Sequence, residues 1–130
     1  MDIDNTKILE LTPPQQGVVP VVKKLSEAYK IWQSALPHFH KTSRYTLGEK
    51  IDKLLVEALE SALFASYASK SEKLPYLKKG ITRIDLAKFF LQLSWEIGDL
   101  DNTQFIALSE KLGEIGKMLN GWSRQAARDK

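Results

Sequence analysis

The side chains able to do acid–base or metal chemistry are few in this sequence, and they form no catalytic pattern. His38 and His40 are the only histidines, and they stand two residues apart in a polar segment without further clear metal ligands. Metal sites in helical bundles use inward glutamates and Glu-x-x-His pairs, and the sequence has no such pair. Phosphate-loop and nucleophile motifs are absent too. We therefore expect no catalytic residues, no metal and no cofactor.

Lysines and arginines give a clearer pattern. Lys79 and Arg83 are four residues apart, and a second group, 117–128, places its cations on one side of a helix within about 40°. Lys41 and Arg44 flank a short loop. Such groups bind phosphates without reading base sequence, although each is also compatible with an ordinary wet surface. The candidates for nucleic-acid binding chosen on charge are Lys41, Arg44, Lys78, Lys79, Arg83, Lys117, Arg124 and Arg128.

Composition sets the broad class. A chain of 130 residues is long enough for one domain with a real core. The net charge is +3, but residues 70–88 alone hold six cations against two acids, a local +4. The absence of cysteine fits a reducing cytoplasm. No apolar run approaches the roughly 18 residues of a membrane span, and the first residues are acidic and polar, unlike a signal peptide.

Four segments repeat apolar residues every three or four positions, and none shows the alternation of a strand. They cover about 18–36, 47–69, 74–98 and 102–122. This pattern predicts an all-α protein, an antiparallel up-down-up-down four-helix bundle spanning residues 18–130. Residues 1–17 end in TPPQQG, which does not continue a helix, so we expect a flexible N-terminal arm there.

The ends of these segments carry recognisable residues. Pro37 ends the first, and Thr46 followed by Glu49 forms a capping box that fixes the start of the second. Gly98 ends the third, and Asp101 or Asn102 precedes the fourth as its N-cap.

Two further features concern packing between helices. Gly113 and Gly116 lie inside the fourth helix at a propensity cost of about 1 kcal/mol each, which predicts close approach by another helix. On the second helix, Lys53 is spaced by four from both Glu49 and Glu57, which predicts a self-paired, solvated face.

The third segment is too apolar for a helix with one buried face. Its apolar arc spans roughly 200°, about twice what a surface helix needs, and that of the second segment spans roughly 180°. We expect these two helices to build a self-association surface, although a position deep inside the monomer is the alternative. A wide arc fits a dimer or a ring equally well. The predicted interface residues are Leu63, Phe89, Phe90, Leu93 and Ile97.

Three stretches carry a family resemblance: KTSRYTLGEKIDKLLVEALESALFAS, KLPYLKKGITRIDLAKFFLQLSWEIGDLDN and LSEKLGEIGKMLNGWSRQ. From Val18 to Arg128 the chain resembles the accessory variability determinants, small four-helix-bundle partners of reverse transcriptases in diversity-generating retroelements. RYTLGEKI and EIGKMLNGW are the most specific pieces. The family is also similar to four-helix proteins encoded in intervening sequences of bacterial 23S rRNA.

The resemblance implies a non-enzymatic homopentameric barrel with a basic surface. It implies binding of RNA and DNA with little sequence preference, and association with the reverse transcriptase during mutagenic copying of template RNA. Lys88, Lys117 and Arg124 fall where the family carries basic residues, which adds Lys88 to the candidates. The Glu/Lys-paired second helix departs from a basic surface.

Two other functions remain open at this point. One is an rRNA- or ribosome-associated bundle of the 23S intervening-sequence type, and the other is a structural oligomer whose partner is a protein. A neighbouring reverse transcriptase gene with paired repeats would favour the retroelement.

Overall fold

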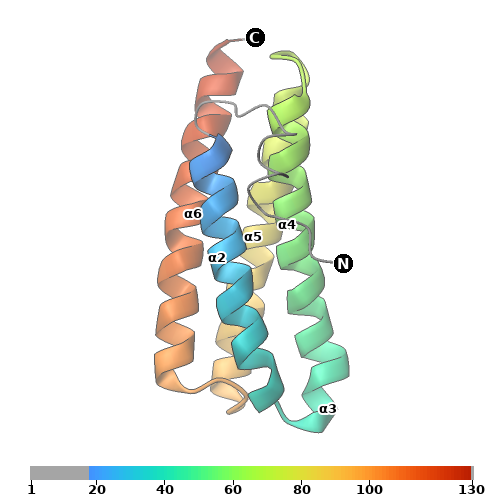
Figure 1. The fold of residues 1–130 in the computed structure, drawn as a ribbon, viewed down its shortest axis with the longest axis vertical. Helices are drawn as coiled ribbons and strands as arrows, with labels where there is room; N and C mark the ends of the chain where they lie inside the picture. The colour runs from blue at the N-terminus through green and yellow to red at the C-terminus, as the bar shows by residue number, and fades with distance from the viewer. Residues whose placement is uncertain (1–17, 130) are drawn as a thin grey trace, which may run out of the picture.

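In the computed structural model, every regular element of residues 18–129 is helical, which confirms the all-α prediction. Four long helices, α2, α4, α5 and α6, lie side by side as a bundle (Figure 1). The structure describes residues 18–129, so Lys130 and the N-terminal arm expected over 1–17 lie outside it. The elements are α2 (Val18–Ala35), η1 (Leu36–His38), α3 (Lys41–Ser43), η2 (Arg44–Gly48), α4 (Glu49–Tyr67), α5 (Lys73–Glu96) and α6 (Asn102–Arg128).

The core is built from one face of each long helix. Trp32 of α2 is fully buried, and its ring meets that of Phe39 edge-on at 5.3 Å between centroids. Complete burial of a large apolar side chain contributes about 1.5–3 kcal/mol, so these residues dominate folding. The largest fully buried side chains are Trp32, Phe39, Ile51, Leu54, Leu77, Ile84, Leu91, Leu108, Leu112, Ile115, Leu119 and Val21.

Three of the predicted helix ends are confirmed. The α-helical part of α2 stops at Ala35, before Pro37. Gly98 follows α5 with φ +87°, a conformation that glycine adopts without strain. Asp101 caps α6: its Oδ1 accepts from Gln104 N at 2.7 Å, and Gln104 Oε1 accepts from Asp101 N at 3.3 Å.

The predicted capping box at Thr46 is wrong. Helical backbone already begins at Lys41, and Thr46 lies inside the π-helical segment η2. Its hydroxyl donates to Thr42 O at 3.1 Å, as hydroxyls do inside a helix, so it does not cap the helix start. A short α turn and a π turn therefore lead directly into α4 without a side-chain cap.

The close approach expected at two glycines occurs at a different one. Nothing lies within 4 Å of a Cβ built at Gly113, and at Gly116 the nearest neighbour is the side chain of Lys88. Gly80 of α5 is the position where helices meet, with Ser61 Cβ at 3.5 Å and Leu119 Cδ1 at 3.8 Å from a built Cβ. Gly80 therefore brings α5 close to both α4 and α6.

Two reciprocal ion pairs join α2 to α6. Lys24 Nζ lies 2.7 Å from Glu114 Oε2, and Lys111 Nζ lies 3.1 Å from Glu27 Oε2. Hydrogen bonds from the lysines lower the pKa values of Glu114 and Glu27, and the bond to Glu114 raises the pKa of Lys24. Each helix supplies one acid and one base, so the two pairs favour this alignment of α2 and α6.

A single carboxylate joins α2 to α4. Asp52 Oδ1 accepts hydrogen bonds from Tyr29 Oη (2.8 Å), Trp32 Nε1 (3.1 Å) and Gln33 Nε2 (3.1 Å). Burial, followed by the bond to Asp52, raises the pKa of Tyr29. Asp52 thus satisfies the indole N–H that the buried Trp32 brings into the core.

Candidate nucleic-acid interface

Four predicted cations lie at one end of the bundle, where α5 begins and α6 ends: Lys78, Lys79, Arg124 and Arg128. The two helix ends are neighbours, because Lys73 Nζ of α5 lies 5.9 Å from the centre of the Trp122 ring of α6 (Figure 1). All four side chains are exposed, and none forms an ion pair with any residue from 18 to 129. We call these four residues the basic end.

Lys73, at the same end, has a structural role. Its ammonium donates to Ala65 O at 2.9 Å and Ala68 O at 3.1 Å, at the last turn of α4. A cation at a helix C-terminus satisfies free carbonyls and favours the helix dipole. The ammonium of Lys73 is thus already bound by backbone carbonyls of α4, whereas the charged groups of the basic end face solvent.

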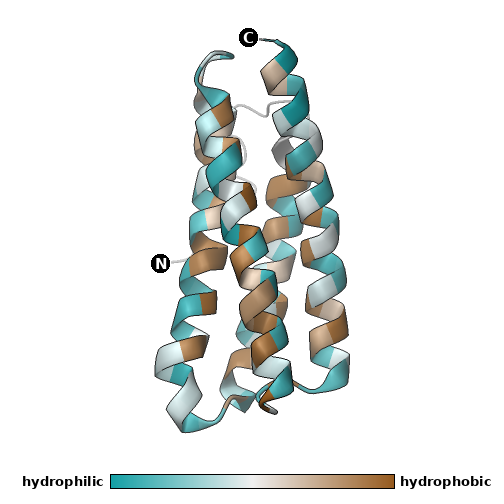
Figure 2. Ribbon diagram, turned by 180° about the vertical axis from the view of Figure 1, so that it is seen from behind, coloured by the Kyte–Doolittle hydropathy of each residue, from teal (hydrophilic) through white to brown (hydrophobic). Residues whose placement is uncertain are grey.

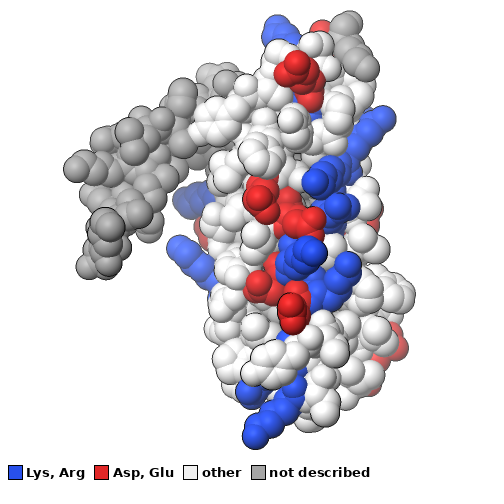
Figure 3. Space-filling view, turned by 90° about the vertical axis from the view of Figure 1, so that its right-hand side faces the viewer, with Lys and Arg blue, Asp and Glu red and all other residues white. Residues whose placement is uncertain are grey.

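Arg83 is paired. Its Nε lies 3.3 Å from Glu57 Oε2 of α4, and both side chains are about one-quarter exposed, at 27% and 26%. The predicted pairing of Glu57 with Lys53 is therefore replaced by a pair between helices. Acidic and basic side chains alternate down the middle of the face that shows α4, so this side is not uniformly basic (Figure 3).

Lys88 and Lys117 meet different surroundings on the α5–α6 side. Lys88 Nζ is 4.0 Å from Asp85 Oδ1, and it would lie 3.2 Å from a Cβ placed on Gly116 of α6. Lys117, the next residue of α6, is exposed and has no ion pair within the described part of the chain. Lys88 thus reaches across to α6, whereas Lys117 points its charge to solvent.

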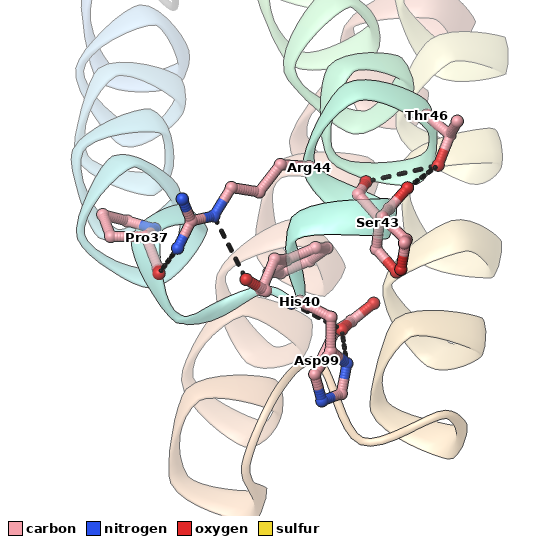
Figure 4. Close-up of polar contacts among 8 residues, drawn as sticks. Pro37, His40, Ser43, Arg44, Thr46 and Asp99 are labelled. Carbon is pink, nitrogen blue, oxygen red and sulfur yellow. Dashed lines mark hydrogen bonds and ion pairs between the residues drawn. The ribbon is translucent and has the colours of Figure 1, made fainter.

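Lys41 and Arg44 lie at the opposite end of the bundle, in the connection before α4 (Figure 1). The Arg44 guanidinium donates from Nε to Phe39 O at 3.1 Å and from Nη2 to Pro37 O at 2.7 Å, which folds the connection back on itself (Figure 4). Lys41 is exposed. The structure therefore does not join these two residues to the basic end.

The two histidines hold the same connection against the start of α6. Asp99 Oδ1 accepts from His40 N at 3.0 Å and lies 2.5 Å from His40 Nδ1 (Figure 4). Gln104 Nε2 lies 3.5 Å from His38 Nδ1. The buried Asp99 was not predicted, because its partner lies 59 residues away. No three His, Asp or Glu side chains gather as metal ligands within residues 18–129.

The predicted interface residues of α5 lie on its surface. Phe89 is 62% exposed, Ile97 51% and Leu93 37%. Leu86, which is not among the predicted interface residues, is 39% exposed. Their spacing of three and four residues puts them on one side of α5, whose second half is coloured as hydrophobic (Figure 2). We call Leu86, Phe89 and Leu93, together with Ile97 directly after the end of the helix, the apolar face of α5.

The two other predicted interface residues are less accessible. Phe90 is half-buried against the core and touches Phe89 edge-on, at 5.5 Å between ring centroids. Leu63 is half-buried on α4. Exposure shows that the apolar face lacks a partner within the described monomer, and its role in self-association stays a prediction.

The described helices include none with the combined length and hydropathy of a membrane span. No protein-family model, curated protein or solved structure matches this chain. The resemblance to the accessory variability determinants therefore rests on the three sequence stretches that carry it.

Proposed function

We propose that this protein is a non-catalytic accessory subunit of a diversity-generating retroelement. It binds template RNA and cDNA with little sequence preference, and it associates with the reverse transcriptase in the cytoplasm to support mutagenic retrohoming. The family resemblance supplies the identity of the partner. The structural support is the basic end.

The charges of the basic end are exposed and unpaired within the described residues, which favours phosphate binding. Lys78, Lys79, Arg124 and Arg128 are exposed and free of carboxylate partners among the described residues. A phosphate can therefore approach them without breaking an ion pair, and each contact releases counterions from the nucleic acid. Such contacts read the backbone rather than the bases, in keeping with low sequence preference.

The apolar face of α5 supports self-association. This face exposes four large apolar side chains to water, which is unfavourable for a monomer. Burying them against another copy of the chain removes that apolar surface from water and so favours association. We propose that antiparallel up-down-up-down bundles assemble through this face. A homopentameric barrel is the assembly that the resemblance implies.

Binding of a structured RNA at several salt concentrations tests the electrostatic part of the proposal. Replacing Lys78, Lys79, Arg124 and Arg128 together with Gln should weaken binding across unrelated sequences. It should also flatten the plot of log affinity against log salt by about 0.7–0.9 for each phosphate that the variant no longer neutralises. The control removes the same number of charges elsewhere, by replacing four exposed lysines of α2 and α4 with Gln: Lys23, Lys30, Lys50 and Lys53. Equal losses in both variants would mean that net charge alone drives binding, and no binding by the wild type would refute the proposal.

Association with the reverse transcriptase needs its own test. The proposal predicts a reverse transcriptase gene beside this one, and its product should co-purify with the chain after nuclease treatment. Co-purification with ribosomal RNA instead would favour the 23S intervening-sequence type. A stable oligomer that binds no nucleic acid would favour a purely structural role.

A further inference from the structure

Three exposed aromatic side chains lie where α4 ends and α5 begins. Phe64 is 54% exposed, Tyr67 52% and Tyr76 39%. The rings of Phe64 and Tyr76 come from different helices, and their centroids lie 5.7 Å apart at an interplanar angle of 44°. We call these three residues the aromatic cluster.

The surroundings of the aromatic cluster are basic. Residues 64–79 hold four lysines against one glutamate, a net charge of +3. Lys78 and Lys79 of the basic end follow Tyr76 closely on α5, and Lys70 is exposed in the turn between the helices. The acids nearest in sequence are Glu72 in the turn and Glu60, one helical turn before Phe64 on α4.

The aromatic cluster differs from the apolar face of α5 in the charge of the residues around it. That face is mainly aliphatic. Residues 85–97 hold two acids, Asp85 and Glu96, against one base, Lys88, so this segment does not attract a polyanion. A second copy of the chain suits such a surface. Aromatic rings set among free lysines suit a ligand that has both flat faces and phosphates.

We infer that the aromatic cluster is a stacking platform for unpaired bases, so that the protein prefers single-stranded nucleic acid or unpaired loops over a duplex. This inference rests on the proposed nucleic-acid function and names the form of its ligand. Every base has a π face, so stacking on Phe64, Tyr67 or Tyr76 tolerates any sequence. In a duplex those faces are covered by neighbouring bases, whereas the phosphates remain available to Lys78 and Lys79.

The test compares three labelled ligands with equal numbers of phosphates: an unstructured RNA, the same strand with abasic positions, and a duplex. Wild-type protein should bind the unstructured RNA more tightly than the abasic strand or the duplex. Phe64→Leu and Tyr76→Leu keep an apolar side chain but remove the ring. Each should weaken binding of the unstructured RNA by about 5- to 150-fold, since stacking contributes about 1–3 kcal/mol per base. Binding of the abasic strand and the salt dependence should not change.

Tyr45→Leu is the matched control, because Tyr45 is 79% exposed and lies at the opposite end of the bundle. Wild-type binding that is equal for all three ligands would overturn the stacking platform and leave the proposed function standing. A wild type that binds none of them would overturn both. If the Leu variants bind RNA normally but change the oligomeric mass, a second copy occupies the rings and the platform is refuted.

Discussion

The guanidinium of Arg83 on α5 faces the carboxylate of Glu57 on α4, with Nε 3.3 Å from Oε2. The pair lies about two helical turns from the contact between Tyr76 and Phe64, since each partner is seven residues from the ring on its own helix. Arg83 therefore has the position of a nucleic-acid contact but a charge that Glu57 already neutralises.

Replacing Glu57 with Gln should release Arg83 and strengthen RNA binding by about fivefold, the upper end of the scale for an ion pair near the surface. Arg83→Gln should have little effect in the wild type and a larger one in the Glu57→Gln background. A double-mutant cycle on RNA affinity measures this coupling. If Arg83→Gln alone weakened RNA binding as much as Lys79→Gln does, Arg83 would be a direct contact in the wild type and this prediction would be wrong.

Introducing charge on the apolar face of α5 should break the assembly. Phe89→Glu and Leu93→Glu each place a carboxylate where another copy would have to desolvate it, so the variants should be monomeric by light scattering at micromolar concentration. Ile106→Glu is the control, because Ile106 is 53% exposed on α6, outside that face. A monomeric wild type would contradict this prediction, as would dissociation of the control.

Two glycine substitutions should act in opposite directions. A Cβ on Gly48 would lie 2.8 Å from Leu36 Cδ1, so Gly48→Ala should destabilise the fold by about 1–3 kcal/mol through overpacking. Gly113 is helical with nothing within 4 Å of its built Cβ, so Gly113→Ala should stabilise by up to about 1 kcal/mol. Urea unfolding gives both values. A stabilising Gly48→Ala would show that moving Leu36 aside costs less than the helix propensity that alanine adds.

Acidification should weaken the attachment of α2 to α6. Lys111 and Lys24 hold the pKa values of Glu27 and Glu114 below the ordinary 4.5, so the unfolded chain binds protons first as the pH falls. The stabilisation is complete above about pH 4.5 and is lost as the pH falls through the lowered values. The Glu27→Gln/Glu114→Gln variant should therefore show a flatter dependence of unfolding free energy on pH in this range. Glu110→Gln, at an exposed α6 position without an ion pair among the described residues, should keep the wild-type slope.

The helices were predictable because their causes are local. Leu108, Leu112, Ile115 and Leu119 repeat with the period of a helix and are all buried. The α6 cap was predictable for the same reason, since Asp101 and its partner Gln104 are three residues apart. Thr46 has the same spacing to Glu49, but helical backbone that begins at Lys41 overrides it.

Which charged side chains form ion pairs was not predictable, because the partners are distant in sequence. Glu57 has a lysine four residues away, yet it pairs with Arg83, 26 residues on. Lys24 and Glu114 are 90 residues apart. Counting charges along the sequence identifies the basic end as a cationic region, but only the packing of α4 against α5 shows that Arg83 is neutralised and Lys79 is not.

The hydrogen bond from the His40 backbone to the buried Asp99 also bears on how the protein opens. His40 belongs to the connection between α2 and α4, and Asp99 to the connection between α5 and α6. The α2–α4 connection cannot move away from the α5–α6 connection without breaking the bond from His40 N to the buried Asp99 Oδ1. We expect amide protons in both connections to exchange together with solvent, as one cooperative unit. Asp99→Ala, which removes the acceptor of the bond from His40 N, should let them exchange at separate rates.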